Sequence, residues 1–161
     1  MGMSVKIRRA NQGDIEAIIS VGRQTWPRTY EFAGAEYVSK GLATWWSAEA
    51  IQRTLETTTV LVADGEKAIV GTGNIDLRPE VPVIWKLYVV PEMQGAGIGS
   101  ALIDELVDVA AGRPVRLEYT DGNAHAAGFY AAHGFVEVRR EANDQPGWPD
   151  AVWLERAPLK R

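Results

Sequence analysis

Residues 91–100, Pro-Glu-Met-Gln-Gly-Ala-Gly-Ile-Gly-Ser, separate an apolar, strand-like run from an amphipathic helical pattern. The run before them, residues 83–90, is rich in β-branched and aromatic side chains and ends at Pro91, which cannot donate to a sheet ladder. Apolar side chains then recur at helical spacing from Ile98 to Val109, so a helix is expected to begin within or just after the glycines. The first amides of a helix lack internal partners, and glycines let phosphates approach that backbone closely. The stretch therefore predicts an anion-binding turn.

Two common nucleotide-binding turns do not fit this stretch. A P-loop needs a lysine followed by Ser or Thr at the start of its helix, but Gly99 is followed directly by Ser100. The dinucleotide fingerprint needs its third glycine three residues after the second, and the residues three beyond Gly97 and Gly99 are Ser100 and Leu102. Two interpretations stay open: a turn for another phosphate-bearing ligand, or a glycine-rich turn that binds nothing.

A second informative segment lies further along the chain. Residues 113–120 predict a strand, and Asn123 is a good N-cap for a short helix over Ala124–His133. Gly134 suits the left-handed backbone that ends such a helix, and Phe135 begins another strand. This segment therefore predicts a strand, a capped helix and a second strand in succession.

Both segments carry patterns that resemble motifs of one enzyme superfamily. Residues 94–99 follow the pattern QxxGxG after a strand that ends in Val-Pro, and residues 123–135 follow NxxAxxFYxxxGF. These patterns are similar to two motifs of the GCN5-related N-acetyltransferase (GNAT) superfamily, and together they cover roughly residues 81–138. The resemblance implies an acetyl-CoA-dependent N-acetyltransferase that transfers the acetyl group directly to a primary amine.

The resemblance also implies an α/β fold, a three-layer α/β/α sandwich around a mixed, mostly antiparallel sheet, which is the acyl-CoA N-acyltransferase fold. The remaining elements occur in an order that fits it. Further strands are expected at residues 5–9, 60–63, 68–76 and 151–156, and helices from Asn11 or Asp14 onward, over 35–41 and over 47–57. Residues 26–34 are expected to break the first helix, and residues 64–67 are expected to form a hairpin turn. The alternating strand 151–156 is expected near a sheet edge, where it would offer a homodimer contact.

Composition fits one enzyme domain over residues 1–161. The chain is 46% hydrophobic, enough for a sizeable core, and no run reaches the ~20 apolar residues of a membrane span. We therefore expect a cytoplasmic protein with no membrane partner. The chain has no cysteine, and neither His125 nor His133 has partners at ligand spacing, so no metal site is expected. A net charge of -4 with dispersed basic residues argues against a nucleic-acid partner.

The resemblance assigns residues to the co-substrate acetyl-CoA. The strand backbone at residues 87–89 is expected to pair with the pantetheine arm, and the glycine turn is expected to hold the pyrophosphate. The expected donor-binding residues are Leu87, Tyr88, Val89, Gln94, Gly95, Ala96, Gly97, Ile98, Gly99, Ser100, Asn123 and Phe129.

Acetyl transfer to an amine needs a group that takes the amine proton and a group that protonates the leaving thiolate. Tyr130 is the candidate acid, because a phenol with a pKa near ~10 is protonated at neutral pH. Glu118 is the candidate base, because it lies five residues before Asn123, where N-terminal protein acetyltransferases of the superfamily place a catalytic glutamate. The alternatives left open are solvent or one of four side chains: Asp76, Asp121, Glu31 and His133.

Aromatic residues before the first hairpin predict either an acceptor pocket or core packing. Trp26, Tyr30 and Trp46 are the candidate substrate-binding residues, and one of the adjacent Trp45 and Trp46 is expected to be partly exposed, because neighbours cannot share one helix face. Small primary amines, polyamines included, are the expected acceptors, with loop 143–150 helping to enclose them. The alternatives are a protein N-terminus as acceptor, a different acyl donor, and a sensor that binds acyl-CoA without catalysis.

Overall fold

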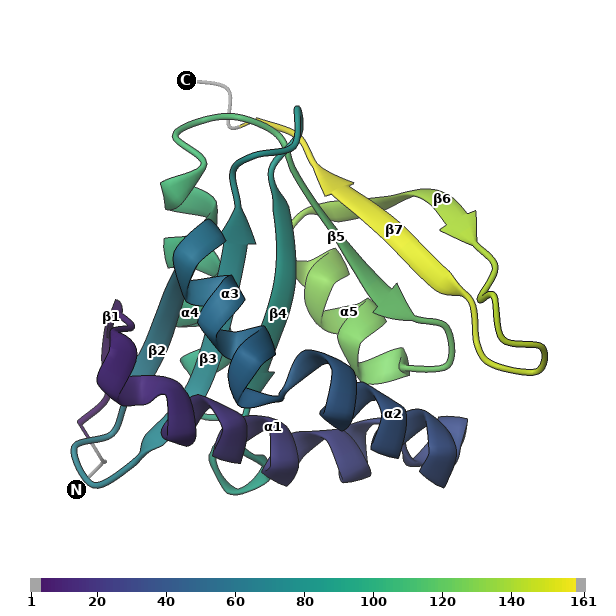
Figure 1. The fold of residues 1–161 in the computed structure, drawn as a ribbon. Coiled ribbons are helices and arrows are strands. Elements are labelled where there is room, and N and C mark those ends of the chain that lie inside the picture. The colour runs from purple at the N-terminus through teal and green to yellow at the C-terminus, as the bar shows by residue number, and fades with distance from the viewer. Residues whose placement is uncertain (1–3, 159–161) are drawn as a thin grey trace.

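The computed structural model describes residues 4–158 and shows one seven-stranded sheet with helices on both faces (Figure 1). The strands are β1 (Lys6–Arg9), β2 (Thr59–Asp64), β3 (Ile69–Asp76), β4 (Val83–Val89), β5 (Val115–Thr120), β6 (Phe135–Glu141) and β7 (Ala151–Arg156). The helices are α1 (Ile15–Thr29), α2 (Ala35–Trp45), α3 (Ala48–Thr57), α4 (Ile98–Val109) and α5 (Ala124–Ala132), with short 3-10 turns at Gln12–Asp14, Glu31–Ala33 and Pro91–Met93. Helices α1, α2 and α3 lie in front of the sheet and α4 and α5 behind it, which confirms the predicted three-layer sandwich (Figure 1).

The sheet order is β1-β2-β3-β4-β5-β7-β6, and every neighbouring pair is antiparallel except β4 and β5. The parallel pair holds only where Val83 and Ile84 face Arg116 and Leu117. A bulge lies just beyond, because Asn74 of β3 pairs with Lys86 whereas Ile75 pairs with Ile84, so the intervening residue of β4 is extra. Past this point β4 and β5 diverge and open a wedge in the middle of the sheet (Figure 1).

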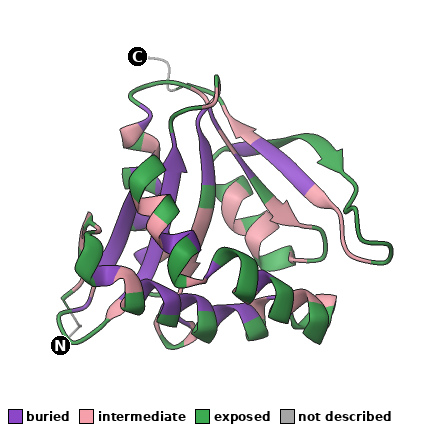
Figure 2. Cartoon of the chain, in the orientation of Figure 1, coloured by how far each residue is buried: buried purple, intermediate pink, exposed green. Residues whose placement is uncertain are grey.

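Apolar side chains form one core on each face of the sheet. Behind it, α4 buries Leu102 and Leu106 against Leu117 and neighbouring strand residues. In front of it, Trp46 and Ile51 pack on Val62 and on α1. Figure 2 shows the resulting contrast between the buried strands β2 and β3 and the largely exposed β6. Within residues 4–158, no helix combines the length and apolar character that crossing a membrane requires.

Helix α1 ends inside the segment 26–34 that was expected to break it, but it continues through Pro27 and ends only at Thr29. Burial of Thr25 and Trp26 in the front core holds this last turn in place, and the Tyr30 backbone N–H closes it by donating to the Trp26 carbonyl at 3.0 Å. Proline removes one helical hydrogen bond, and here tertiary packing offsets that loss.

Helix α2 also exceeds its predicted range and runs past Gly41 to Trp45. Gly41 is retained inside the helix because the Trp26 ring packs against it: a Cβ added there would lie 2.0 Å from Trp26 Cζ3. At the end of α2, Trp45 is 56% exposed and Trp46 is 2% exposed, which confirms that the two neighbours divide between solvent and core.

Strand β7 lies near a sheet edge, as expected, but it is the strand beside the edge and not the edge strand itself. It pairs with β5 on one side and with β6 on the other, so its backbone groups are already used. The exposed edge at that end of the sheet is β6. A sequence that alternates along 151–156 cannot distinguish an outer strand from the one beside it, because both bury one face.

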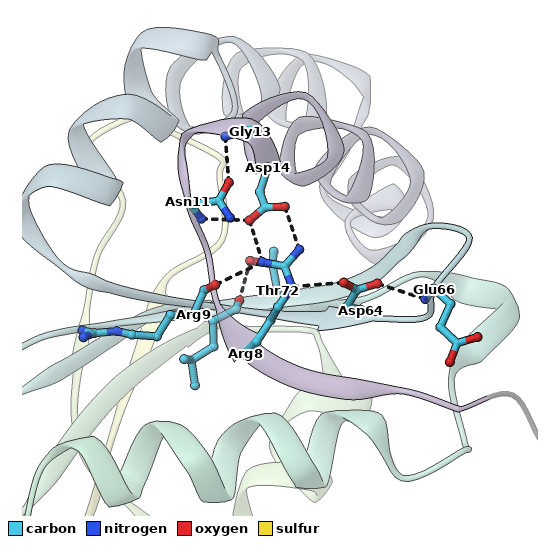
Figure 3. A network of polar contacts seen from close by, with 9 residues as sticks. Arg8, Arg9, Asn11, Gly13, Asp14, Asp64, Glu66 and Thr72 are labelled. Carbon is cyan, nitrogen blue, oxygen red and sulfur yellow. Dashed lines mark hydrogen bonds and ion pairs between the residues drawn. The ribbon is translucent and has the colours of Figure 1, made fainter.

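Arg8 ties the first strand to the start of α1 and to the end of β2 (Figure 3). It donates two hydrogen bonds of 2.9 Å to the carboxylate of the buried Asp14 and one of 3.0 Å to Asp64. Asp14 also accepts the backbone N–H of Asn11 at 2.8 Å, which completes a capping box. The hydrogen bonds from Arg8 hold the pKa of Asp14 below its usual range.

Arg8→Met is expected to lower the free energy of unfolding at pH 7 by about 2 kcal/mol, because it leaves the buried Asp14 carboxylate without its cation. Since the pKa of Asp14 is depressed in the folded state, the stabilisation is fully present above its unfolded pKa of about 3.9 and is lost as the pH falls through the folded value. Urea unfolding of both proteins at pH 7 and at pH 3 measures the effect. An equal difference between the two proteins at both pH values would contradict this role.

Candidate active site

A cavity of about 660 Å³ is lined by β4, β5 and the elements that border the wedge between them. Its walls come from the end of α1, the glycine turn and the first residues of α4, and the first two turns of α5. Among the predicted site residues, those that line it are Tyr30, Leu87, Tyr88, Val89, Gln94, Gly95, Gly97, Gly99, Ser100, Glu118, Asn123, Phe129 and Tyr130. Four predicted residues do not line it: Trp26, Trp46, Ala96 and Ile98. The fold therefore brings both predicted motifs to one cavity.

The glycine turn is shaped to admit an anion. Gly95 and Gly97 both have φ of 84°, in the left-handed region, and Gly97 is the N-cap of α4. A Cβ at either position would meet no other atom within 4 Å, so the space over this backbone is open. Gln94 steadies the turn by donating its side-chain amide to the Val89 carbonyl at 3.0 Å. Open space beside the unpaired first amides of a helix fits a phosphate group.

Gly97→Ala is expected to weaken acetyl-CoA binding at least ~10-fold. The left-handed backbone costs about 1–2 kcal/mol for a residue with a Cβ, and the new methyl group would stand where the phosphates approach. Gly112→Ala is the matched control, because Gly112 has φ of 88° and equally open surroundings but lies beyond the far end of α4, outside this cavity. Calorimetric titration with acetyl-CoA measures both variants; equal affinities for them would contradict the assignment.

Helix α5 forms the wall opposite the glycine turn. Asn123 caps it by accepting the backbone N–H of Ala126 at 3.1 Å, as predicted, and its side chain also lines the cavity. Phe129 packs against Gly99, where an added Cβ would lie 3.4 Å from the Phe129 ring. Helices α4 and α5 thus approach each other at Gly99, with just enough room for a methyl group there.

Tyr130 lines the cavity, and its hydroxyl has no side-chain hydrogen bond to any residue in the range 4–158. Burial raises the pKa of Tyr130 well above the ordinary value, with a smaller contribution from Tyr30. The phenol is therefore protonated at every pH at which an enzyme of this kind works. It can donate a hydrogen bond to a ligand atom, as the sequence prediction requires of an acid.

Glu118 is the only one of the five candidate bases that lines the cavity within the described part of the chain. Partial desolvation, together with the negative charge of Glu141, raises the pKa of its carboxyl, while Arg139 opposes the shift. Asp76, by contrast, is bound by Arg78 at 2.9 Å, which holds its pKa low. A carboxylate with a raised pKa that faces a cavity is the better proton acceptor.

The aromatic residues divide between the core and the cavity. Trp26 and Trp46 lie in the front core, 7% and 2% exposed, whereas Tyr30 reaches the cavity and its hydroxyl lies 2.8 Å from that of Tyr88. Burial raises the pKa of Tyr30 to about 12. The two tryptophans therefore do not line the cavity but support its wall from within the front core.

Several lining residues escaped the sequence analysis, notably Arg28 of α1 and Trp85 and Lys86 of β4. Strand alternation alone would have placed Lys86 on the same face as Tyr88. Nothing in the sequence marks the bulge at Trp85 or brings the end of α1 to this strand.

Comparisons with known proteins agree with this geometry. A family model described as an acetyltransferase (GNAT) domain matches residues 56–137, just over half of the chain. A search of curated proteins finds no significant sequence match. Among solved structures, the PaiA N-acetyltransferase of Thermoplasma acidophilum in complex with coenzyme A is similar, with a TM-score of 0.83 and 23% identity over 96% of this chain and 99% of that one.

Two further structures share the fold. The ribosomal-protein-S18-alanine N-acetyltransferase of Escherichia coli has a TM-score of 0.77 and 20% identity, over 98% of this chain and 96% of that one. Ard1 of Thermoplasma volcanium has a TM-score of 0.76 and 20% identity, over 97% of this chain and 99% of that one. The chain therefore belongs to the GNAT acetyltransferase family, and the protein is an acetyl-CoA-dependent N-acetyltransferase.

Proposed function

We propose that the protein transfers the acetyl group directly from acetyl-CoA to the primary amine of a small molecule, polyamines being among the candidates. The observation that carries this proposal is a single cavity whose lining joins the glycine turn, Tyr130 and the end of α1. Its volume of about 660 Å³ lies within the range of roughly 300–1,000 Å³ that is usual for small-molecule sites.

The loop between β6 and β7 packs against α2 in the front layer. Trp148 of this loop packs edge-on against Tyr37 of α2, with 5.3 Å between ring centroids, and Lys40 Nζ lies 5.2 Å from the Trp148 ring centroid. Tyr37 in turn shares a hydrogen bond of 3.0 Å with Thr120 at the end of β5. These contacts hold the loop against α2 and near the end of β5. No residue of loop 143–150 lines the cavity, so the loop does not enclose the acceptor as expected, and the small acceptor rests on the cavity itself.

The free backbone of β4 supports the proposed donor site. Beyond Ile84, β4 has no partner on its β5 side among the described residues, so the edge at Leu87–Val89 is available to the pantetheine arm like an added strand. An amide on this edge would also polarise the thioester carbonyl.

In the proposed reaction, Glu118 takes a proton from the acceptor ammonium, directly or through water. The neutral amine then attacks the thioester carbonyl carbon to form the C–N bond, the C–S bond breaks, and the Tyr130 hydroxyl gives its proton to the leaving sulfur. The second proton, lost by the acetylated nitrogen, passes through water to the Tyr130 oxygen and restores the neutral phenol. The raised pKa of Glu118 favours the first step, because it makes the carboxylate a stronger base at neutral pH.

Thiol release from acetyl-CoA, measured with a panel of small amines and of peptides, tests the proposal, and mass spectrometry identifies the acetylated product. Release with small amines is the expected result. Release with peptides alone would replace the small acceptor by a protein N-terminus. Binding of acetyl-CoA without release on the whole panel would favour the sensor.

A further inference from the structure

The cavity contains two cations that the proposed reaction does not use. Lys86 comes from β4 and Arg28 from the last turn of α1, and both line the cavity. Among residues 4–158, neither takes part in an ion pair. The chain as a whole has a net charge of -4, so two unpaired cations beside one cavity are not a consequence of surplus positive charge.

Lys86 lies on the front face of the sheet, away from the glycine turn. Its backbone pairs with Asn74 and that of Tyr88 with Thr72, so the two side chains share one face of β4. The Lys86 Nζ lies 5.3 Å from the ring centroid of Trp46, which belongs to the front core. The turn at residues 94–97, by contrast, leads into α4 behind the sheet (Figure 1).

Distance along the strand separates Lys86 further from the donor phosphates. Val89 lies three residue steps beyond Lys86, roughly 10 Å of extended chain, and the glycine turn begins beyond Val89. The pyrophosphate expected in that turn would therefore not reach Lys86. Lys86 can therefore pair with a negative charge on the acceptor, but not with the phosphates of the donor.

Among residues 4–158, no anion compensates the charge of Lys86: Glu118 lines the same cavity but does not contribute to the pKa shift of Lys86. Burial lowers the pKa of Lys86 to about 8, because desolvation penalises the ammonium form. Contact with the Trp46 ring offsets only part of that penalty. A carboxylate bound in the cavity would stabilise the charged form and restore the pKa.

We propose that Lys86, assisted by Arg28, forms an anion subsite for a carboxylate carried by the acceptor, so that the acceptor class is amino-acid-like: a primary amine that also bears a carboxylate. This inference rests on the proposed function and narrows it. Glu118 meets the acceptor ammonium, and the two cations meet its carboxylate, so the cavity complements a zwitterion. A polyamine would bring a second positive charge against Lys86 and Arg28 and is expected to be a poor acceptor.

The experiment compares L-amino acids with their carboxamides, and with spermidine and putrescine, in the thiol-release assay at saturating acetyl-CoA. For the unmodified protein we expect kcat/KM to be at least ~10-fold higher for a carboxylate than for its carboxamide. Lys86→Met is expected to reduce this ratio to within ~3-fold, mainly through a higher KM for the amino acid. The comparison of ratios between proteins cancels the different intrinsic reactivities of the two amines.

Lys86→Arg is the matched control, because it keeps the positive charge and is expected to retain most of the preference. Urea unfolding of each variant checks that the front core is intact. Preference for polyamines or carboxamides, or an unchanged ratio in Lys86→Met, would overturn the anion subsite while the proposed function stands. An equal fall of kcat for every acceptor in Lys86→Met would also overturn the anion subsite, and it would indicate that Lys86 acts in proton transfer instead. Absence of release with any amine would instead contradict the proposed function.

Discussion

Tyr130→Phe is expected to lower kcat about 100-fold, the usual size of a general acid's contribution. The change removes only the hydroxyl of a residue that lines the cavity, and this hydroxyl has no side-chain hydrogen bond within the described part of the chain. The aromatic ring, which packs edge-on against Phe135 and Phe129, is kept. The KM for acetyl-CoA and the free energy of unfolding should therefore change little.

Single-turnover measurement of acetyl transfer is the appropriate assay, because it isolates the chemical step from product release. Calorimetric titration with acetyl-CoA and urea unfolding of the same variant serve as controls. If Tyr130→Phe transfers the acetyl group at the unmodified rate while chemistry limits turnover, Tyr130 is not the acid. A loss of affinity for acetyl-CoA that accounts for the whole effect would assign the hydroxyl to binding instead.

Trp46→Ala is expected to lower the free energy of unfolding by about 3–5 kcal/mol, the usual cost of removing a large, fully buried aromatic ring. The Trp46 ring is 2% exposed and fills the space that Gly22 leaves: a Cβ at Gly22 would lie 2.2 Å from Trp46 Cδ2. It also packs edge-on against Tyr88, with 5.3 Å between ring centroids. Loss of the Trp46 ring would therefore also remove support from Tyr88 in the front wall of the cavity.

Trp46→Phe provides the matched control. The Nε1–H of Trp46 is buried and has no hydrogen-bond partner among residues 4–158, so its removal carries no penalty from a broken bond. Phe keeps most of the ring volume, and we expect less than half the destabilisation of the alanine variant. Urea unfolding at pH 7 measures both. A cost below about 1 kcal/mol for Trp46→Ala would show that the front core collapses to fill the space.

Local chemistry explains why the two motif segments were predictable. The glycines of the anion turn, the cap at Asn123 and the end of α5 before Gly134 each depend on side chains or dihedral angles within a few residues of one another. Such rules act at short range, so the segment itself carries them. The candidate acid Tyr130 was found in the same way, through its place in the second pattern.

Sequence analysis was wrong where distant residues decide the local structure. Pro27 and Gly41 are both helix-weakening residues, yet α1 and α2 run past them because the Trp26 ring buries itself between the two helices. Propensity is worth about 1–3 kcal/mol at such positions, and burial of a large aromatic side chain exceeds it. The alternation of β7 likewise could not tell that it lies beside the edge strand and is not itself the edge, since its neighbours on both sides are set by sheet order.

The sequence by itself determined the family, the strand-turn-helix that admits the donor, and the acid candidate, because these features are encoded in contiguous residues. Only the tertiary structure decided that the end of α1 lines the cavity, that Glu118 rather than Asp76 lines it, and that Lys86 and Arg28 share it. The bulge in β4 and its divergence from β5 create that cavity, and both arise from pairing between segments far apart in the chain. Pairing of this kind depends on the whole sheet, so no single stretch of sequence records it.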